Sequence, residues 1–477
     1  MGEKQDIPIN EKTVPFLFGR AVNLCPHKTF IRSPDKTLTY SEFNDLTNCC
    51  ANRLAERGLK KGGKLGIMMH NSIAFVHSWI AASKLGVIYV PINTDYKGDI
   101  LQYQLNKADV THLIVDASLA SRVGDVISEL PQLQEVILYQ DAVTESDLAL
   151  LAGHCRVSEF ENFLIGSALE PSVEIRHTDP LAISFTSGTT GPSKGVLATN
   201  CHVISFAMDW ITACQFDMND RLFTPLPMFH AIATWLGVIP TFIVGTEIAF
   251  VKNLSISRFW DDVRKYKSSV VHGIFAMVPM LLKQPEREDD KDVPARLFYI
   301  GQRNETFETR FNCRIVEVYG ATETGIVTYT PLEEEPARGS CGRANTSSYH
   351  VAIVDDEDNI QPAGVVGEIV VRPAQPFSMI QEYYNMPTET LDAFRNLWFH
   401  TGDNGRLDSD GFFYYVDRKK DAIRRRGENI SSFELEVVLN ADDRVAECAA
   451  IAEPSDLGED DVKMVVVPAA GKALTAG

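Results

Sequence analysis

The chain has 477 residues, a mass of 53.0 kDa and a net charge of −19, with 45% hydrophobic and 23% charged residues. Its length exceeds what one hydrophobic core usually supports, so we expect a soluble globular protein with two or more domains. The acidic balance argues against a nucleic-acid partner, because phosphate backbones would be repelled overall.

The sequence carries no sign of export or of membrane insertion. The N-terminal residues lack a basic start followed by an apolar core, so no secretory signal is predicted. The longest candidate span, residues 232–250, is interrupted by Gly237, Pro240 and Gly245, so no membrane span is expected. The cysteines are scattered and odd in number, without a C-x-x-C pair, which fits a cytoplasmic location.

The first part of the chain alternates helical and strand patterns. A capping box from Ser41 to Asn44 predicts the start of a helix. We then expect a strand, a helix and a second strand over residues 64–69, 73–85 and 87–92. This βαβ order favours a parallel sheet covered by helices.

The segment TSGTTGPSKGV, residues 186–196, follows an apolar run and combines hydroxyls, glycines and a lysine. Glycines bring backbone N–H groups against an anion, hydroxyls add donors, and Lys194 adds a point charge. The spacing is not that of a Walker loop, because Gly195 stands where that pattern needs Ser or Thr. The residues that we expect to bind phosphate are Thr186, Ser187, Gly188, Thr189, Thr190, Gly191 and Lys194.

The same segment permits other interpretations. Gly191, Ser193 and Gly195 match G-x-S-x-G, the nucleophile elbow of serine hydrolases, with His400 and Asp403 as candidate partners of Ser193. A flexible turn, or a nucleotide-binding protein without catalysis, would also be compatible with this composition.

Residues 180–319 are expected to repeat the βαβ order. A helix is predicted from about Asn200, with strands over residues 245–251 and 270–275. The charged run EREDDKD, residues 286–292, is interpreted as a solvated loop. His230, in PLPMFHA, is either a structural residue or a catalyst.

YGATETG, residues 319–325, follows an apolar stretch and carries a hydroxyl at Thr322 and a carboxylate at Glu323. Magnesium is usually bound by one or two carboxylates together with substrate phosphates. We therefore predict that Glu323 is a Mg²⁺ ligand and that Thr322 contacts phosphate.

Beyond Gly339 the pattern changes to short antiparallel strands, which predicts a small β subdomain. Its strands are expected over residues 351–355, 367–373 and 411–416. Within WFHTGD, residues 398–403, Asp403 is predicted to accept hydrogen bonds from a ribose diol.

The linker YVDRKKD, residues 415–421, leads into a tail and is interpreted as a hinge or as an exposed linker. Ser431 and Glu434 predict a capping box for a short helix. Strands are expected over residues 445–452 and 463–468.

These motifs, in this order and spacing, resemble the adenylate-forming superfamily of acyl-CoA synthetases, luciferases and peptide-synthetase adenylation domains. The resemblance runs from about Leu38 to the last residue and is most similar in texture to crotonobetaine/carnitine-CoA ligase-like enzymes. It implies an α/β fold. A large AMP-binding domain over residues 1–416, with two βαβ-type sheet subdomains and a small β-barrel subdomain, would precede a partial, mobile α+β domain over residues 417–477.

The reaction implied by this resemblance has two steps. ATP and a small carboxylic acid form an acyl adenylate with release of pyrophosphate, and coenzyme A then displaces AMP to give the acyl-CoA thioester. Positioning and charge neutralisation would supply most of the catalysis.

The resemblance also assigns roles to residues. Residues 186–194 would hold the β and γ phosphates, Thr322 the α phosphate and Glu323 the magnesium ion, while His230 would gate the carboxylate channel. Ribose is assigned to Asp403 and Arg418, and adenine to residues 301–303 and 317–319, which include Gly301, Gln302, Arg303, Glu317 and Tyr319. Gly320 and Ala321 are further cofactor-binding residues, Lys420 is the hinge, and Gly427, Glu428 and Asn429 meet the CoA channel.

Two departures from the family pattern affect these expectations. The chain reads GQRN at residues 301–304, where many members have G-G-A or G-S-A. The family's C-terminal P-R-T-x-x-G-K segment is not found before Gly477, and Lys472 lacks its context, so we expect either a truncated form or a weakened enzyme that forms the adenylate slowly.

The acid itself is not specified by the sequence. The residues that would border an acyl pocket are Ile232, Trp235, His272, Ile274 and Phe275. A homodimer is expected only as the commonest assembly.

Overall fold

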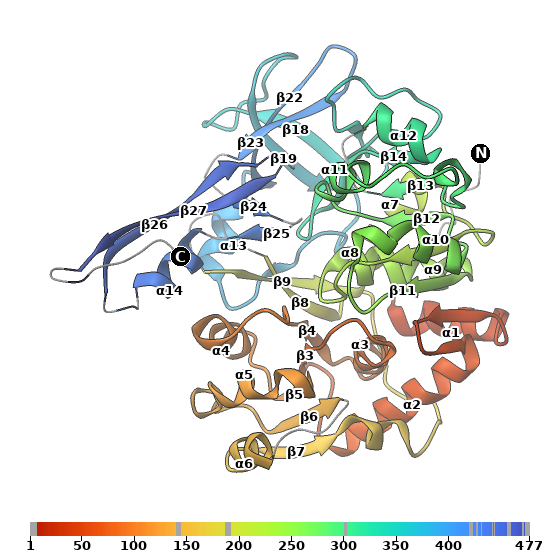
Figure 1. Ribbon diagram of the computed structural model, residues 1–477, viewed down its shortest axis with the longest axis vertical. Coiled ribbons are helices and arrows are strands. Elements are labelled where there is room, and N and C mark those ends of the chain that lie inside the picture. The colour runs from red at the N-terminus through yellow and green to blue at the C-terminus, as the bar shows by residue number, and fades with distance from the viewer. Residues whose placement is uncertain are drawn as a thin grey trace.

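The computed structural model contains two large sheets, a smaller antiparallel sheet and a C-terminal extension (Figure 1). It describes residues 7–139, 145–186, 192–299, 303–418, 423–425, 428–430, 432–440, 442, 444–455, 459–469 and 472. The mixed α/β class that was predicted is confirmed.

The first large sheet combines the N-terminal βαβ units with the strands that flank the phosphate loop. In spatial order its strands are β20 (Glu382–Tyr383), β9 (Lys194–Thr199), β8 (Pro180–Thr186), β4 (Ile88–Pro91), β3 (Lys64–Met68), β5 (His112–Asp116), β6 (Glu135–Tyr139) and β7 (Arg156–Glu159). Pairing is parallel from β7 to β8 and antiparallel between β8 and β9. The predicted strands and the helix over residues 73–85 are confirmed.

The second large sheet is parallel except at its edge. Its strands are β14 (Arg314–Val316), β13 (Leu297–Tyr299), β12 (Val270–His272), β10 (Arg221–Thr224), β11 (Glu247–Phe250), β1 (Thr29–Arg32) and β2 (Thr37–Thr39). β1 thus joins this sheet from the N-terminal part of the chain.

The expected βαβ order over residues 180–319 is confirmed from β10 to β14, which pair in parallel in the second sheet, but the first strand of this region lies elsewhere. β8 pairs with β4 of the first sheet, so the strand that leads into the phosphate loop belongs to the N-terminal unit. The loop also joins two antiparallel strands rather than a strand and a helix, because β9 lies between the loop and the predicted helix.

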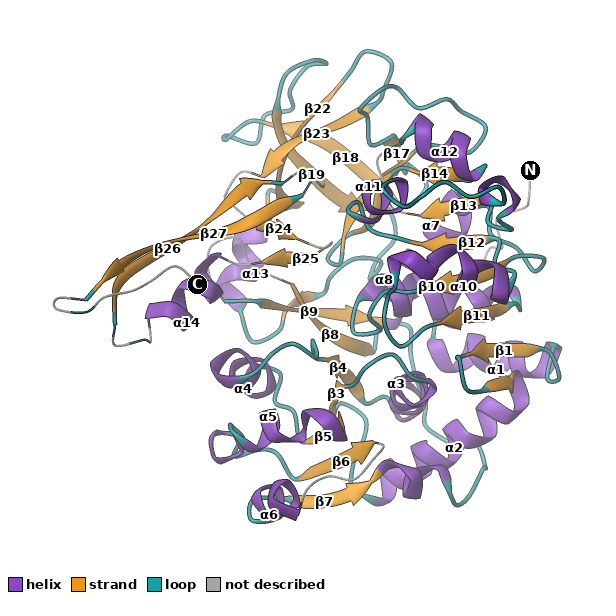
Figure 2. Ribbon diagram, in the orientation of Figure 1, coloured by secondary structure: helices purple, strands orange, loops and turns teal. Residues whose placement is uncertain are grey.

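Helices cover both faces of the first sheet. In Figure 2, α4 (Gly98–Lys107) and α5 (Ala120–Gly124) lie on one side of its strands, and α2 (Tyr40–Glu56) and α3 (Ile73–Leu85) lie on the other.

The other α helices before the tail are α1 (Val14–Leu24), α6 (Glu145–Ala152), α7 (Asn200–Cys214), α8 (Ala231–Ala233), α9 (Ile239–Val244), α10 (Phe259–Tyr266), α11 (Met277–Leu282), α12 (Glu305–Phe311) and α13 (Pro387–Ala393). Shorter 3-10 turns are η1 (Ile9–Glu11), η2 (Ala117–Leu119), η3 (Ile127–Glu129), η4 (Phe160–Leu164), η6 (Ile256–Arg258) and η7 (Asp290–Asp292), and a π-helical turn, η5 (Thr234–Val238), follows α8.

The start of α2 differs from the prediction. Its N-cap is Thr39, whose hydroxyl accepts the Glu42 N–H while the Glu42 carboxylate accepts the Thr39 N–H at 2.9 Å. The predicted partner of Ser41, Asn44, instead accepts a hydrogen bond from the buried ammonium of Lys84 at 2.8 Å. A true carboxylate at the third helical position therefore determined the cap.

The small β subdomain that was predicted is an antiparallel sheet. Its strands are β18 (Tyr349–Val354), β19 (Gly367–Pro373), β22 (Trp398–Leu407), β21 (Phe394–Arg395) and β23 (Phe413–Arg418), and a neighbouring small sheet holds β15 (Val318–Ala321), β16 (Gly325–Tyr329) and β17 (Arg343–Ala344). Apolar side chains of β16 and β9 pack with this subdomain in one cluster. This packing brings the small subdomain against the phosphate-loop hairpin.

The C-terminal region projects from the rest of the molecule in Figure 1. Its elements are β24 (Ile423–Arg425), β25 (Glu428–Ile430), α14 (Ser432–Asn440), β26 (Val445–Pro454) and β27 (Asp460–Pro468), which confirms the predicted helix and strands. The predicted cap residue Ser431 lies outside the described residues.

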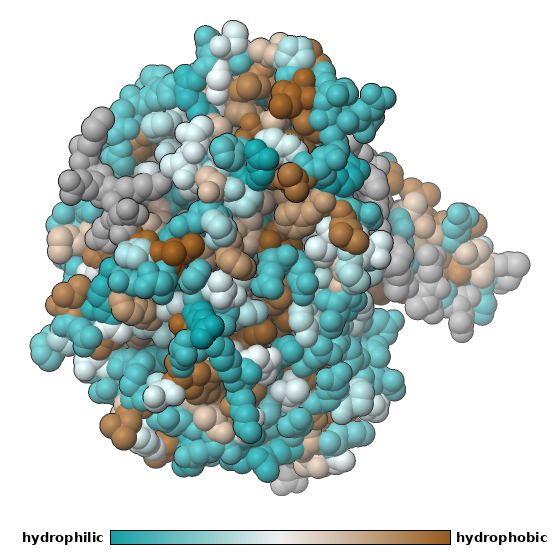
Figure 3. All heavy atoms as spheres, turned by 180° about the vertical axis from the view of Figure 1, so that it is seen from behind, coloured by the Kyte–Doolittle hydropathy of each residue, from teal (hydrophilic) through white to brown (hydrophobic). Residues whose placement is uncertain are grey.

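A continuous apolar core joins the two large sheets. Trp79, Trp210 and Trp235 are among its largest buried side chains. On the face shown in Figure 3, apolar side chains are scattered among hydrophilic ones. No helix in the described part of the chain has the length and apolar character needed to cross a membrane.

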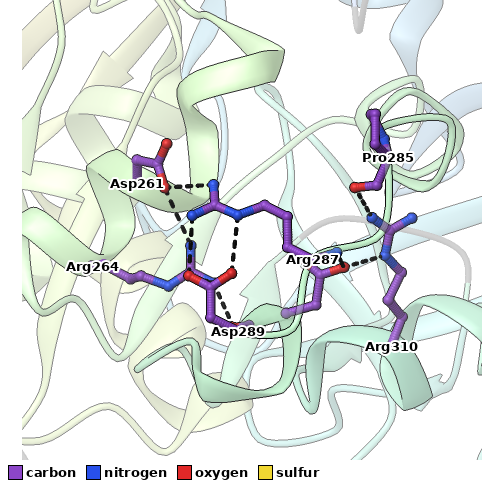
Figure 4. Close-up of polar contacts among 7 residues, drawn as sticks. Asp261, Arg264, Pro285, Arg287, Asp289 and Arg310 are labelled. Atoms are coloured by element: carbon purple, nitrogen blue, oxygen red, sulfur yellow. Dashed lines mark hydrogen bonds and ion pairs between the residues drawn. The ribbon is translucent and has the colours of Figure 1, made fainter.

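The charged run at residues 286–292 is more than a solvated loop. Asp290 is 5% exposed and accepts from Arg310 Nε at 2.7 Å, and Arg310 also donates to the Pro285 carbonyl at 2.8 Å. Arg287 donates to Asp261 at 2.7 Å (Figure 4). The loop is therefore held by ion pairs to α10 and α12, which the sequence alone did not indicate.

Candidate functional site

The phosphate-loop segment lies at the tip of the β8–β9 hairpin. β8 ends at Thr186 and β9 begins at Lys194, and these two residues are paired across the hairpin. Residues 187–191, which include the predicted ligands Ser187, Gly188, Thr189, Thr190 and Gly191, lie outside the described residues. The hairpin therefore brings the hydroxyl and the ammonium at the two ends of the loop to the same end of the first sheet.

Ser193 does not have the environment of a hydrolase nucleophile. It is 1% exposed, its hydroxyl accepts from Gln104 Nε2 at 3.2 Å, and its carbonyl accepts from the Tyr103 hydroxyl at 3.1 Å. A nucleophile elbow requires an exposed serine on a sharp turn between a strand and a helix. The serine here is buried and is followed by a strand, so the hydrolase interpretation is not supported.

A cluster of four side chains, which we call the phosphate-end cluster, forms where the hairpin meets the β15–β16 turn. Glu323 Oε1 accepts from Thr186 Oγ1 at 2.9 Å and from the Tyr383 hydroxyl at 3.2 Å. The Lys194 ammonium lies 4.9 Å from the centre of the Tyr383 ring. Thr186, Lys194, Glu323 and Tyr383 thus combine one carboxylate, one ammonium and two hydroxyls.

Tyr383 was not identified from the sequence. It lies on β20, which pairs with β9, and it is 6% exposed. Its position depends on strand pairing between segments almost two hundred residues apart, so no local motif could reveal it. The tyrosine connects the predicted magnesium ligand with the predicted phosphate-binding lysine.

The turn that carries Thr322 and Glu323 has a tightly fixed backbone. A side-chain carbon at Gly320 would lie 2.0 Å from the carbonyl oxygen of Gly325, so only glycine fits there. The Ala321 N–H donates to the Thr324 hydroxyl at 3.2 Å, which closes the turn. Thr322 itself is partly exposed.

A second group, the ribose-end pair, lies on β15 and β22. The Tyr319 hydroxyl donates to Asp403 Oδ2 at 2.8 Å, and Asp403 is 5% exposed. Burial and the adjacent carboxylate raise the pKa of Tyr319 well above its usual value, so the phenol remains protonated and continues to donate. Arg418 is the cross-strand neighbour of Asp403 on β23.

The predicted adenine segment is partly described. Glu317 is 6% exposed, and its Oε1 accepts the Arg303 N–H at 2.9 Å. Burial raises the pKa of the Glu317 carboxyl. The Arg303 guanidinium is engaged by Glu308 at 3.1 Å and by Glu335, while Gly301 and Gln302 lie outside the described residues.

His230 occupies a different element from the two groups above. It is the N-cap residue of α8, and its ring lies 5.3 Å from that of Phe229. Of the expected acyl-pocket residues, Trp235 and His272 are buried, and Trp235 Nε1 donates to the Tyr89 hydroxyl. The remaining three, Ile232, Ile274 and Phe275, are partly buried.

The residues predicted to act from the tail are only partly described. Lys420 and Gly427 lie outside the described residues. Glu428 and Asn429 form β25, where they pair with Arg425 and Arg424 of β24.

The donor set at the phosphate end is compatible with a magnesium ion that binds mainly to substrate. No group of three or more His, Cys, Asp or Glu side chains that could hold a metal is found among the residues that the structure describes. One carboxylate with neighbouring hydroxyls is what a metal bound largely by phosphate oxygens and water needs from a protein.

Comparisons with known proteins show the family of the chain. A family model described as AMP-binding enzyme matches residues 18–384. A crotonobetaine/carnitine–CoA ligase of Proteus mirabilis (strain HI4320) is 30% identical over 460 residues, which cover 92% of this chain and 85% of that protein.

Solved structures give the same result. A Mycobacterium tuberculosis fatty acyl CoA synthetase is 29% identical, with a TM-score of 0.75 over 96% of this chain and 88% of that chain. The N-terminal domain of FACL13 from the same organism, in an inhibitor-bound crystal structure, is also 29% identical, with a TM-score of 0.75 over 85% of this chain and 99% of that domain.

Proposed function

The chain belongs to the AMP-binding enzyme family, and on that basis we infer that it is an ATP-dependent acid–CoA ligase of the AMP-forming type. It activates a carboxylic acid as an acyl adenylate with release of pyrophosphate, and it then transfers the acyl group to coenzyme A. The observation that carries this function is the placement of the phosphate-end cluster and the ribose-end pair at the two ends of one short segment, Tyr319 to Glu323.

We propose specific roles for these side chains. Thr186 and Lys194 would bind the β and γ phosphates, and Thr322 the α phosphate. Lys194 contributes a positive charge where negative charge shifts toward pyrophosphate, which is the main requirement of phosphoryl and adenylyl transfer. The Asp403 carboxylate would accept hydrogen bonds from both ribose hydroxyls.

The Glu323 carboxylate would hold Mg²⁺ when the nucleotide is bound. The ion would supply charge neutralisation at the phosphates. Before that, the carboxylate accepts hydrogen bonds from Thr186 and Tyr383, which fix its orientation. The protein therefore supplies a pre-oriented oxygen ligand rather than a complete metal site.

Further roles rest on the family resemblance. Glu317 and Tyr319, with Gly301 and Gln302, would line the adenine, Gly320 and Ala321 would contact the nucleotide, and His230 would gate the entry of the acid. In the same proposal, residues 417–477 form a small domain that turns about Lys420, Arg418 assists at the ribose, and Gly427, Glu428 and Asn429 meet coenzyme A. A homodimer stays a prediction.

The test is a screen of carboxylic acids for AMP release with ATP, Mg²⁺ and coenzyme A. The proposal predicts that at least one acid gives AMP, pyrophosphate and a thioester in equal amounts. ADP as the product, or nucleotide binding without turnover with every acid, would contradict it and would favour a binding protein.

A further inference from the structure

The ribose-end aspartate lies on a backbone irregularity of β22. The pairing of β19 with β22 steps across residues 401–403, so these residues lie opposite Ile369 alone. Gly402, in the middle, has φ of 74°, a left-handed conformation that glycine adopts readily. The Thr401 hydroxyl donates to the Ile369 carbonyl at 2.7 Å and accepts the Asp403 N–H at 3.1 Å. Because bulges redirect side chains, the direction of Asp403 depends on this bulge.

A buried carboxylate of β19 holds the bulge. Glu368 is 4% exposed, and its Oε1 accepts the Gly402 N–H at 3.0 Å. Its Oε2 lies 3.1 Å from His400 Nδ1 and 3.8 Å from Arg395 Nη2. His400 is 9% exposed, and its Nε2 lies 3.7 Å from Asp358 Oδ1. One oxygen of Glu368 therefore binds the bulge, while the other faces two basic side chains.

The contacts of Glu368 go beyond those that a buried carboxylate in a sheet needs for stability. A buried carboxylate needs charged or hydrogen-bonding partners, and Glu368 has them in His400 and Arg395. Its remaining oxygen makes a charge-assisted hydrogen bond to a backbone N–H, a strong and directional contact. That N–H belongs to the residue directly before Asp403. Asp403 is thus fixed from the backbone by Glu368 and from the side chain by Tyr319.

We propose that Glu368, supported by His400, is a positioning residue for the nucleotide, which locks the bulge so that Asp403 points its carboxylate at the ribose diol. Neither residue touches substrate in this role. The inference rests on the proposed ribose role of Asp403.

The experiment compares ATP with 2′,3′-dideoxy-ATP as substrates, by the kcat and KM of pyrophosphate release. The wild type is expected to prefer ATP, because only ATP presents the diol. Glu368→Ala should raise the KM for ATP about ten-fold, which is the equivalent of one charge-assisted hydrogen bond. The same variant should leave the KM for dideoxy-ATP nearly unchanged. Glu357→Ala is the matched control, since Glu357 is exposed in the same subdomain.

Two further variants separate positioning from folding. Glu368→Gln keeps an oxygen that can accept the Gly402 N–H, so it should recover part of the preference for ATP. Gly402→Ala disturbs the bulge without removing the carboxylate, and no neighbouring atom lies within 4 Å of the added side-chain carbon. This variant should therefore lose the preference for ATP even where Glu368→Ala fails to fold. Combining Glu368→Ala with Asp403→Asn should add no further loss.

The outcomes are distinct. Equal losses for ATP and dideoxy-ATP in Glu368→Ala and Gly402→Ala, or additive losses in the double variant, would overturn the positioning role while the function stands. A wild type that does not distinguish the two nucleotides would overturn the ribose role of Asp403, and with it this inference.

Discussion

At the scale of single residues, the Glu323 carboxylate permits a direct test of the proposed metal role. Glu323→Gln keeps the size of the side chain but removes the negative charge that a magnesium ion requires. We expect about a 100-fold lower rate of ATP–pyrophosphate exchange, as for the loss of metal-assisted charge stabilisation. The exposed Glu382→Gln on β20 serves as the control, and unchanged exchange in Glu323→Gln would refute the metal role.

Tyr383 permits a finer test of the phosphate-end cluster. Tyr383→Phe loses the hydroxyl bound to Glu323 but keeps the ring beneath Lys194. A loss of about five-fold in kcat/KM for ATP is expected, in line with one neutral donor to a charged acceptor. Tyr383→Leu should cost more, because the cation–π contact is lost as well. Equal activity of Tyr383→Leu and the wild type would contradict this role.

Buried histidines make stability dependent on pH. Burial lowers the pKa of both His202 and His272 to about 3, against about 6.5 in an unfolded chain. The unfolded state therefore takes up protons first as the pH falls, and stability that is present above pH ~6.5 is lost below it. Between pH 7.5 and 5.5 each histidine should lower the free energy of unfolding by about 1.4 kcal/mol.

Urea unfolding at these two pH values checks the prediction. His202→Phe should reduce the pH-dependent loss of unfolding free energy by about 1.4 kcal/mol, the contribution of one histidine. His27→Gln, at an exposed position, should leave that loss unchanged. The same loss in His202→Phe and the wild type would show that His202 does not contribute.

At the scale of elements, the charged run at residues 286–292 depends on one buried ion pair. The side chains of Asp290 and Arg310 are 7% and 11% exposed. Asp290→Asn leaves the arginine without its counter-charge, so we expect about 3 kcal/mol of destabilisation in urea or thermal unfolding. Glu288→Gln in the same loop is exposed and should have little effect; equal effects of the two would contradict a structural role for the pair.

Individual elements were predictable where local patterns determine them. The helix over residues 73–85 and the strands around it follow from apolar periodicity and flanking turns. The α2 cap was misplaced because Thr39 and Glu42 satisfied the capping box better than Ser41 and Asn44. β9 was missed because the glycine-rich loop obscured the strand that follows Lys194.

At the scale of the whole molecule, the prediction of sheet membership failed where a strand pairs with a sheet formed mainly by another part of the chain. β8 joins the N-terminal sheet, and β1 joins the second sheet. Such pairings depend on the burial of apolar faces between segments far apart in sequence, which local patterns do not encode. Motif residues such as Thr186, Glu323 and Asp403 could be selected as candidates from their chemistry, whereas Tyr383 and Glu368 became candidates only when distant strands were placed together.

We propose that the phosphate-end cluster and the ribose-end pair hold one nucleotide. The decisive measurement is a crystal structure with an unreactive ATP analogue and Mg²⁺. We expect the triphosphate beside Thr186 and Lys194, the ion on Glu323, and the ribose hydroxyls on Asp403. A nucleotide bound elsewhere, with Glu323 still bonded to Thr186 and Tyr383 and no ion beside it, would show that these two groups do not form one nucleotide site.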